Sequence, residues 1–228
     1  MNQQTTLKKM FNIHHFKTLD STNDKAISFK ENSVIIADEQ KQGKGRFQRP
    51  WISQKGGIYM SIVLPIIENP QLYTFIAALS AKQAINNKQI KIKWPNDLIY
   101  RKKKLSGILT EIKNNKTIVG IGINTNNKIQ TELKYKSTSL REITKKEIYN
   151  KHIINSLLNQ FESYLTPLNP DRIINDWKKS SFLGDKITVK TLSKTYEGIA
   201  FDIDKDCFLI LKDKKGKKIT IREGDVLC

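Results

Sequence analysis

A basic loop that contains two glycines separates two apolar runs early in the chain. The runs, at positions 34–37 and 59–64, are rich in β-branched residues, so each predicts a strand. Between them, residues 40–51 include two glycines, Gly43 and Gly45, and cationic side chains that interleave with and follow them: Lys44, Arg46 and Arg49. Glycine lets backbone N–H groups approach a ligand closely, and lysine and arginine suit a phosphate or carboxylate. We therefore expect two strands that hold an anion-binding loop between them.

The chain carries a large positive charge. Its 228 residues include 40 Lys and Arg against 22 Asp and Glu, which gives a formal net charge of +18. Such a field attracts polyanions, so a nucleic-acid-binding function stays open as an alternative. The lysines are scattered among many Asn and Ile residues, a distribution that also indicates a compositional bias. The sequence contains neither an aromatic and basic stacking array nor a helix-turn-helix pattern.

The cysteine content and the apolar runs indicate the compartment. Cys207 and Cys228 are too few for a disulfide framework or a metal cluster, and no Cys/His spacing resembles a zinc site. No apolar stretch approaches the ~20 residues that span a membrane, and the first residues lack an apolar signal segment. We expect a cytoplasmic protein that does not associate with membranes.

Apolar periodicity predicts a chain of both helices and strands up to about Ser181, and short strands alone after it. Before it, strands are expected at 13–19, 34–37, 58–64, 90–94, 98–100, 105–112 and 117–124, helices at 20–32, 72–85, 145–165 and 171–179, and a polar loop at 126–140. After it come short β runs at 186–192, 196–203, 208–211 and 218–221. We predict two domains, 1–181 and 182–228.

Several polar positions allow both a structural and a binding interpretation. Ser21 and Thr22 are good helix N-caps, and their hydroxyl groups would also suit a polar ligand. Asn96 and Asp97 fit a turn between two strands by turn chemistry alone. Lys104 differs from the basic residues before it, because it enters an apolar strand and can turn its ammonium group inward toward an anion.

Glycines interrupt two neighbouring strands. Gly107 lies in one, and Gly120 and Gly122 lie in the next. Glycine weakens a strand, so its use in both indicates a ligand or another part of the chain that lies over the sheet. A bulge or tight packing explains the pattern equally well.

Five motifs together resemble the biotin protein ligases. In chain order they are residues 21–23 (Ser-Thr-Asn), the loop 40–51, residues 93–97 (Lys-Trp-Pro-Asn-Asp), residues 104–111 (Lys-Leu-Ser-Gly-Ile-Leu-Thr-Glu) and residues 120–124 (Gly-Ile-Gly-Ile-Asn). The resemblance implies an α+β fold, with a central mixed sheet flanked by helices as in class II aminoacyl-tRNA synthetases and a small C-terminal SH3-like barrel.

The same resemblance implies a two-step reaction. Biotin and MgATP would give biotinyl-5′-AMP and pyrophosphate, and a lysine of the biotin carboxyl carrier protein of acetyl-CoA carboxylase would then accept the biotinyl group. ATP and biotin are the implied substrates and Mg²⁺ the implied metal. A mixed anhydride gives a carboxylate the leaving group that an amine can displace. Family members commonly pair through the central sheet, so a homodimer is an open expectation.

The resemblance also implies residue roles. Biotin's ureido and ring region would meet Ser21, Thr22, Asn23 and Gln40. The biotin carboxylate and the adenylate phosphate would be wrapped by Gly43, Lys44, Gly45 and Arg46. Lys104 would contact the biotin carboxyl oxygen and the α-phosphate, and Arg46 and Lys104 form the implied catalytic pair. The glycines that would leave room for biotin are Gly107, Gly120 and Gly122. The nucleotide side would comprise Arg49, Trp51, Asn96, Asp97 and Asn124, with Asp97 a partner for magnesium or ribose.

The chain departs from the family pattern in the loop and at its start. Lys44 stands where the family has its first arginine and Gln48 where it has a later glycine. Lysine keeps the charge but loses the bidentate fork, so weaker retention of the adenylate is expected. Few residues precede the first expected strand, so we expect no N-terminal winged helix and no operator binding.

One alternative lies within the superfamily. A lipoate ligase or octanoyl transferase shares the sheet and a lysine in the same general place. Such enzymes should lack the loop motif with its downstream Trp51, which this chain has. The loop therefore favours biotin as the substrate.

Overall fold

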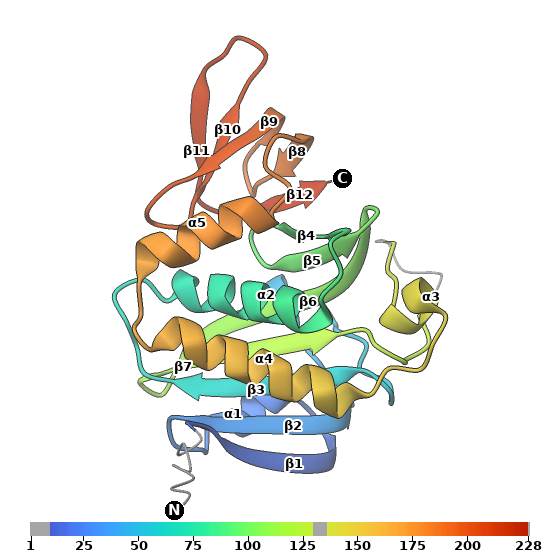
Figure 1. Cartoon of the computed structure of the whole chain (residues 1–228). Helices are drawn as coiled ribbons and strands as arrows, with labels where there is room; N and C mark the ends of the chain where they lie inside the picture. The colour runs from blue at the N-terminus through green and yellow to red at the C-terminus, as the bar shows by residue number, and fades with distance from the viewer. Residues whose placement is uncertain (1–9, 130–135, 228) are drawn as a thin grey trace, which may run out of the picture.

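The computed structural model, which describes residues 10–129 and 136–227, contains two β-sheets (Figure 1). The larger is seven-stranded, in the order β1-β2-β3-β7-β6-β5-β4. Its strands are β1 (Asn12–Leu19), β2 (Ser33–Gln40), β3 (Ile58–Leu64), β4 (Ile90–Lys93), β5 (Asp97–Tyr100), β6 (Lys103–Lys113) and β7 (Lys116–Ile123). β1 pairs with β2 in parallel and every other pair is antiparallel, so the sheet is mixed.

Alternating side chains give this sheet two different faces. Val34, Ile36, Ile62 and Val119 belong to the main core, together with apolar residues of helix α2 (Gln71–Ile85). The alternate positions Ile35, Val63 and Ile118 pack instead with Ala26 of the short helix α1 (Thr22–Ala26). Because side chains of a strand alternate between faces, one face carries α2 and the other carries α1.

The helices on the main face differ in burial: α2 is buried over most of its length, from Leu72 to Ala81, whereas α4 (Asn150–Leu165) and α5 (Pro170–Ser180) each bury one face. In Figure 1, α2 and α4 lie across the large sheet, and α5 continues toward the C-terminal sheet. The Asn169 side chain caps α5 by accepting from the Arg172 N–H, and Pro170 stands at its first turn, where no backbone N–H is needed. Phe75 of α2 stacks on Trp177 of α5, with ring centroids 4.5 Å apart.

The second sheet is antiparallel and five-stranded, in the order β11-β10-β9-β8-β12. Its strands are β8 (Lys186–Lys190), β9 (Thr195–Ile203), β10 (Leu209–Lys212), β11 (Lys218–Ile221) and β12 (Asp225–Leu227). Figure 1 shows it beyond the β4 end of the large sheet, far from β1. The Phe182 N–H donates to Ile92 O at 3.1 Å, and Trp94 Nε1 donates to Cys207 O at 3.0 Å, so the two sheets are joined directly.

The fold class expected from the sequence is confirmed, while some element bounds are corrected. Helix α1 ends at Ala26, so the expected helix at 20–32 was too long. The expected loop at 126–140 lies partly outside the described residues, and a short helix α3 (Leu140–Thr144) follows it. Helix α4 begins at Asn150 rather than 145, because Lys145 adopts a left-handed conformation. Within the described residues, no helix is long and apolar enough to cross a membrane.

Candidate functional site

The α1 face of the large sheet is hollow where glycines of neighbouring strands are paired. Gly107 of β6 pairs with Gly122 of β7, and Gly120 lies between Leu109 of β6 and Ser61 of β3. These positions share the face of Ile118, which packs toward α1. Because glycine has no side chain, the sheet recedes there, and a cavity of about 990 Å³ opens over it.

Every site residue expected from the sequence lines this cavity except Gly43. Those that line it are Ser21, Thr22, Asn23, Gln40, Lys44, Gly45, Arg46, Arg49, Trp51, Asn96, Asp97, Lys104, Gly107, Gly120, Gly122 and Asn124. Gly43 makes a contact within the loop instead: its carbonyl accepts from the Trp51 N–H at 2.8 Å. A side chain at this position would collide with the Trp51 carbonyl and the Ser53 hydroxyl, so Gly43 allows the loop to pack closely.

Protein side chains occupy the space directly over the glycines. The Trp51 indole lies against Gly122 and Gly107, and Asn23 Oδ1 lies against Gly120. Lys104 Nζ stands 5.3 Å from the centroid of the Trp51 ring, within the range of a cation–π contact. The glycines therefore admit Trp51 and Asn23 close to the sheet in this structure.

One end of the cavity is built from neutral hydrogen-bonding groups. Gln40 Oε1 accepts from the Thr22 N–H at 2.7 Å and from Thr22 Oγ1 at 3.0 Å. Gln40 Nε2 donates to Ser53 Oγ at 2.8 Å, which fixes which end of the amide faces Thr22. Ser61 Oγ lies 2.8 Å from Thr22 Oγ1 and 2.6 Å from Asn23 Oδ1. The donors and acceptors of this end are thus held in defined orientations.

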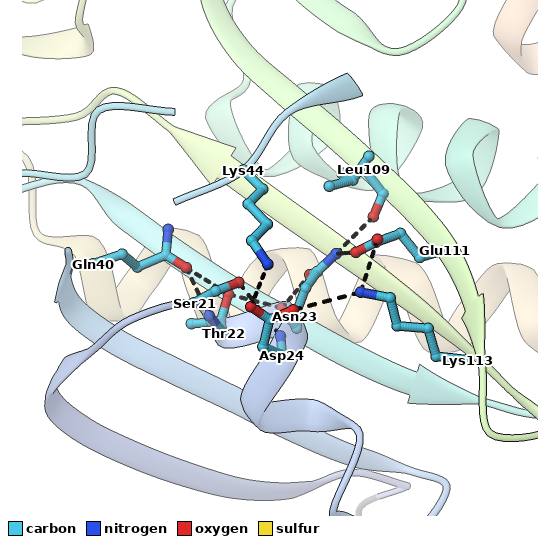
Figure 2. A network of polar contacts seen from close by, with 10 residues as sticks. Ser21, Thr22, Asn23, Asp24, Gln40, Lys44, Leu109, Glu111 and Lys113 are labelled. Carbon is cyan, nitrogen blue, oxygen red and sulfur yellow. Dashed lines mark hydrogen bonds and ion pairs between the residues drawn. The ribbon is translucent and has the colours of Figure 1, made fainter. Parts of the chain in front are cut away.

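A charged network continues from Asn23 across the sheet (Figure 2). Asn23 Nδ2 donates to Glu111 Oε2 at 2.7 Å, and Lys113 Nζ lies 3.0 Å from Glu111 Oε1 and 3.4 Å from Asp24 Oδ1. Figure 2 shows Lys44 reaching from the loop to Asp24, and this ion pair measures 2.5 Å. The ammonium group of Lys44 is therefore engaged by helix α1.

The network shifts the pKa values of its charged members. Burial acts to raise the pKa of Asp24, but the hydrogen bonds and positive charges of Lys44 and Lys113 outweigh it and hold that pKa below its usual value. Burial acts to lower the pKa of Lys113, but its hydrogen bond to Glu111 and the two nearby carboxylates raise it. Both shifts favour the ionised forms.

The part of the cavity around Asp97 and Arg46 is lined by positively charged side chains. Lys104 Nζ lies 2.7 Å from Asp97 Oδ1, and Lys93 Nζ lies 3.5 Å from Asp97 Oδ2. The pair of Lys104 and Asp97 is a charge contact, and Asp97 Oδ1 is buried without a directed hydrogen bond. Arg46 is largely enclosed, with 23% of its side chain exposed, and burial lowers its pKa. The arrangement suits an anionic ligand.

Two asparagines around this part of the site form hydrogen bonds within the protein. Asn96 Nδ2 donates to Ile108 O, and the Ile108 N–H donates to Asn96 O at 2.9 Å. Asn124 Oδ1 accepts from Asn127 Nδ2 at 3.0 Å. Both asparagines are buried, so each already has a structural role whatever it contributes to a ligand.

The structure adds residues that sequence reasoning missed. They are Asp24, Ser53, Ser61, Glu111, Lys113 and Asp225. Ser61 carried a usable signal, since it is a polar residue within the apolar run 58–64. Asp225 carried none, because its contacts with Arg46 and Arg49 join opposite ends of the chain.

The part of the chain that the structure describes does not form a metal site by itself. Within the described ranges, no group of three or more His, Cys, Asp or Glu side chains could hold an ion. The carboxylate oxygens of the cavity do suit a magnesium ion that arrives bound to a phosphate ligand, since magnesium usually takes only one or two protein carboxylates. Asp97, with its buried Oδ1, is the carboxylate that lines the cavity beside Lys104.

Comparison with known families gives two matches along the chain. Residues 15–126 match the sequence model of the biotin/lipoate A/B protein ligase family. Residues 182–227 match that of the biotin protein ligase C-terminal domain. The first match contains every residue that was expected to form the site.

Individual relatives agree with these matches. The bifunctional ligase/repressor BirA of Bacillus subtilis is 35% identical over 210 residues, which cover 82% of this chain and 64% of the relative. The chain thus spans less than two thirds of that protein. The biotin–[acetyl-CoA-carboxylase] ligase of Mycobacterium tuberculosis is 27% identical over 209 residues, covering 85% of this chain and 78% of the relative.

Solved structures resemble the whole arrangement. Biotin protein ligase from Aquifex aeolicus, in complex with biotin and ATP, superposes with a TM-score of 0.86 at 28% identity. The superposition covers 95% of this chain and 98% of that one. The fold of the large sheet and of the small C-terminal sheet is therefore shared.

Proposed function

Since this chain belongs to the biotin protein ligases, we propose that it activates biotin with MgATP and transfers the biotinyl group to a lysine of a carrier protein. The observation that supports this most is the cavity itself. Residues from five separate motifs line it, with neutral hydrogen-bonding groups around Thr22 and Gln40 and cations around Arg46 and Lys104. Biotin has the same polarity, with a neutral ureido ring at one end and a carboxylate at the other.

In the first step, an oxygen of the biotin carboxylate attacks the α-phosphorus of ATP. A P–O bond forms, the bond to the β-phosphate oxygen breaks, and pyrophosphate leaves. In the second step, the acceptor lysine amine attacks the carbonyl carbon of the mixed anhydride. The new C–N bond forms as AMP leaves with the electron pair of the broken C–O bond, and the amine loses a proton.

The neutral hydrogen-bonding groups at one end of the cavity would bind the ureido ring of biotin. Thr22 and Gln40 present hydroxyl and amide groups, and Ser53 and Ser61 hold their orientation. An oriented set of donors and acceptors rejects ligands that leave it unpaired, so it provides specificity beyond simple apolar burial.

The cationic end would stabilise charge at phosphorus. Lys104 and Arg46 carry the positive charge that a phosphoryl transition state needs. Lys104 would exchange part of its contact with Asp97 for the ligand, since the ion pair lies at the cavity wall. Mg²⁺ would enter as part of MgATP, neutralising phosphate charge, with Asp97 as its protein ligand.

The acceptor is the carboxyl carrier protein of acetyl-CoA carboxylase in this proposal, by analogy with the Mycobacterium tuberculosis relative's name. A second cavity of about 790 Å³ shares Arg46 and Asn96 with the first and reaches Arg222, which lies between β11 and β12. Such a second opening supports access for a second substrate.

We further propose that the chain is divided into a catalytic domain, 1–181, and a C-terminal domain, 182–228.

Three further features belong to the proposal. Cys207 is buried and forms no disulfide, which fits a cytoplasmic location.

Strand β1 forms one edge of the large sheet and is largely exposed, so it is the edge through which a homodimer would form. Sedimentation of the protein alone tests whether it dimerises. Specific DNA binding is not expected, and a gel-shift titration at physiological salt tests it.

The deciding experiment is ATP–pyrophosphate exchange with biotin, lipoate or octanoate supplied separately. We expect exchange with biotin only. Lys104→Ala and Arg46→Ala should each lower the exchange rate by about a hundredfold or more, as removal of one charge-stabilising donor typically does.

The matched control is Lys91→Ala, which removes a lysine from neighbouring strand β4 that pairs with Asp185 outside the cavity. This variant should keep wild-type exchange. Lipoate-driven exchange would retain adenylation but assign a different substrate, which matters because the matched family includes lipoate ligases. Absence of exchange with every acid would refute the proposed activity.

A further inference from the structure

The last strand of the C-terminal sheet forms part of the cavity wall. Asp225, Val226 and Leu227 of β12 line the cavity together with the loop residues Arg46 and Arg49. Lys93 Nζ, on the large sheet, donates to Val226 O at 3.3 Å. A strand that pairs with β8 in the small sheet therefore contacts the side chains that are proposed to meet the adenylate.

Asp225 bridges two arginines of the loop. Its Oδ2 lies 2.6 Å from Arg49 Nη2 and its Oδ1 lies 3.6 Å from Arg46 Nη1. Arg46 Nη1 also donates to Gly224 O at 3.1 Å. The Asp225 and Arg46 side chains are each 23% exposed, so solvent screens this contact less than it screens a surface ion pair.

The loop between the two arginines adopts a backbone that needs support. Phe47 and Gln48 both have φ of +56°, in the left-handed region that non-glycine residues seldom adopt. The Phe47 ring is 52% exposed, with Arg46 Cζ at 4.9 Å and Arg49 Cζ at 5.4 Å from its centroid. Such conformations persist only when the surroundings hold them, and apolar burial of Phe47 does not.

Two guanidinium groups held close together repel each other. Burial lowers the pKa of Arg46, the charge of Asp225 opposes this change, and the charge of Arg49 adds to it. The charges of Asp97 and Glu223 also oppose the change, but Asp225 opposes it most and contacts both guanidinium groups, so it does most to offset their repulsion.

We propose that Asp225 is a positioning residue of the C-terminal sheet, which holds Arg46 and Arg49 together in the unliganded enzyme so that they are ready for the anionic ligand. Asp225 acts through the two arginines and does not touch the reacting atoms. The inference rests on the proposed function for its catalytic consequence, but the ordering of the loop is a property of the protein alone.

Preorganisation predicts a particular kinetic signature. Without Asp225, each ligand must order the loop as it binds, so affinity falls. Once the adenylate is in place its own charge pairs the arginines, so the bound-state reaction changes less. Asp225→Asn should therefore raise the KM for biotin and for ATP by about fivefold, with kcat within about twofold of wild type. Asp225→Glu, which keeps the charge, should restore part of the loss.

Limited proteolysis tests the loop without any catalysis. Chymotrypsin can cut after Phe47, and we expect Asp225→Asn to be cut there several times faster than wild type in the absence of ligand. Glu223→Gln is the matched control, since it removes an exposed carboxylate two positions away that forms no ion pair within the described part of the chain. The charge of Glu223 raises the pKa of Arg46 less than that of Asp225 does, so this variant tests a nearby negative charge without the direct contact. If Asp225→Asn does not fold, Arg49→Gln removes the other side of the contact and should increase the same cleavage.

The outcomes separate this inference from the proposed function. Faster cleavage and the KM rise in Asp225→Asn, with Glu223→Gln unchanged, support it. Equal cleavage in Asp225→Asn and wild type would overturn it, as would the same effect in Glu223→Gln, which would indicate a general charge effect. If wild type shows no exchange, the proposed function fails while the cleavage comparison still decides the role of Asp225.

Discussion

Ser61 is a small polar side chain in a strand that is otherwise apolar. It is fully buried, and its hydroxyl lies within hydrogen-bond distance of both Thr22 and Asn23. Pairing between strands places it beside Gly120, so its hydroxyl faces the hollow of the sheet. One hydroxyl group therefore connects two of the side chains expected to read the ligand.

Removing this hydroxyl should weaken biotin binding. Ser61→Ala leaves Thr22 and Asn23 without a shared partner, and a lost hydrogen bond of about 1 kcal/mol corresponds to roughly a fivefold rise in the KM for biotin. The kcat should change little, because Ser61 lies at the neutral end of the cavity. Steady-state exchange kinetics measure both constants.

Ser80→Ala provides the control for that substitution. Ser80 is equally buried, lies on α2 and has no hydrogen-bond partner for its Oγ within the described residues. Its replacement should leave the KM for biotin and the free energy of unfolding near wild type. A Ser61→Ala enzyme with a normal KM for biotin would show that Ser61 only fills space.

Asp24 should make stability depend on pH in the acidic range. Its pKa is below the usual 3.8, because Lys44 and Lys113 outweigh burial. A depressed pKa contributes stability that is complete above the unfolded-state value and is lost as pH falls through the folded-state value. Since 38% of the side chain is exposed, screening limits the contribution to at most about 1 kcal/mol.

Urea unfolding of wild type and Asp24→Asn at several pH values measures this effect. Wild type should be the more stable protein near neutral pH, and the difference should vanish well below pH 3.8, where Asp24 is protonated in both folded and unfolded states. A difference that stays constant down to that range would mean that the ionised carboxylate is not responsible.

Sequence reasoning singled out residues within motifs and missed the residues that support them. Thr22 and Gln40 belong to recognisable motifs, and both line one cavity. Ser53 and Asp225 lie outside those motifs and act by orienting other side chains. A supporting residue needs only a hydroxyl or carboxylate at the right place in space, and short-range sequence patterns do not encode that place.

At the scale of elements, two adjacent strands are shaped by what lies over them. Gly107 and Gly122 are paired across β6 and β7, and the Trp51 indole rests on both. The sequence indicated that something approaches this sheet closely. It could not indicate that an indole from the preceding loop does so, because that contact depends on how the loop returns over the sheet.

A double-mutant cycle tests the contact between loop and sheet. Gly122→Ala places a methyl group against Trp51 and should lower the free energy of unfolding by about 1–3 kcal/mol, the usual cost of overpacking. In a Trp51→Ala background the same substitution should cost little, since the indole is gone. Urea denaturation of the four proteins gives the coupling energy, and a coupling near zero would mean that the indole is not packed there in solution.

Boundaries of elements were less predictable than their existence. The strands of the large sheet were anticipated from apolar alternation, whereas α1 is much shorter than its polar sequence suggested. Ser21 caps α1 by accepting from the Asp24 N–H, but a single short turn suffices once Ala26 is packed on the sheet. Tertiary packing set the length of this helix.

At the scale of the whole molecule, the two sheets share one hydrophobic core. Apolar residues of the small sheet, such as Val189 and Leu209, belong to the same buried cluster as those around α2. Trp94, at the end of β4, donates its indole hydrogen to Cys207 O, and Lys178 of α5 pairs with Asp202 of β9 at 2.8 Å. Asp225 adds a link through the ligand loop. Such continuity predicts that the sheets unfold together.

Two probes in different parts of the chain can follow that process. Tryptophan fluorescence reports the region 1–181, which contains Trp51, Trp94 and Trp177. Cys207 reports the small sheet, because it is buried and burial raises the pKa of its thiol to about 12, so it should react with a thiol reagent only after exposure. A Cys228→Ser background makes this thiol the sole reactive group.

We expect the two probes to give one urea midpoint, because opening the small sheet alone would expose the shared core and leave the Trp94 and Cys207 groups unpaired. Trp94→Phe removes that hydrogen bond while keeping an aromatic ring, and it should lower the free energy of unfolding by about 1–3 kcal/mol by both probes equally. Pulse labelling of Cys207 at urea concentrations where fluorescence is still native would contradict this expectation. It would mean that the C-terminal sheet opens independently, and the arginines held by Asp225 would then be released whenever it does.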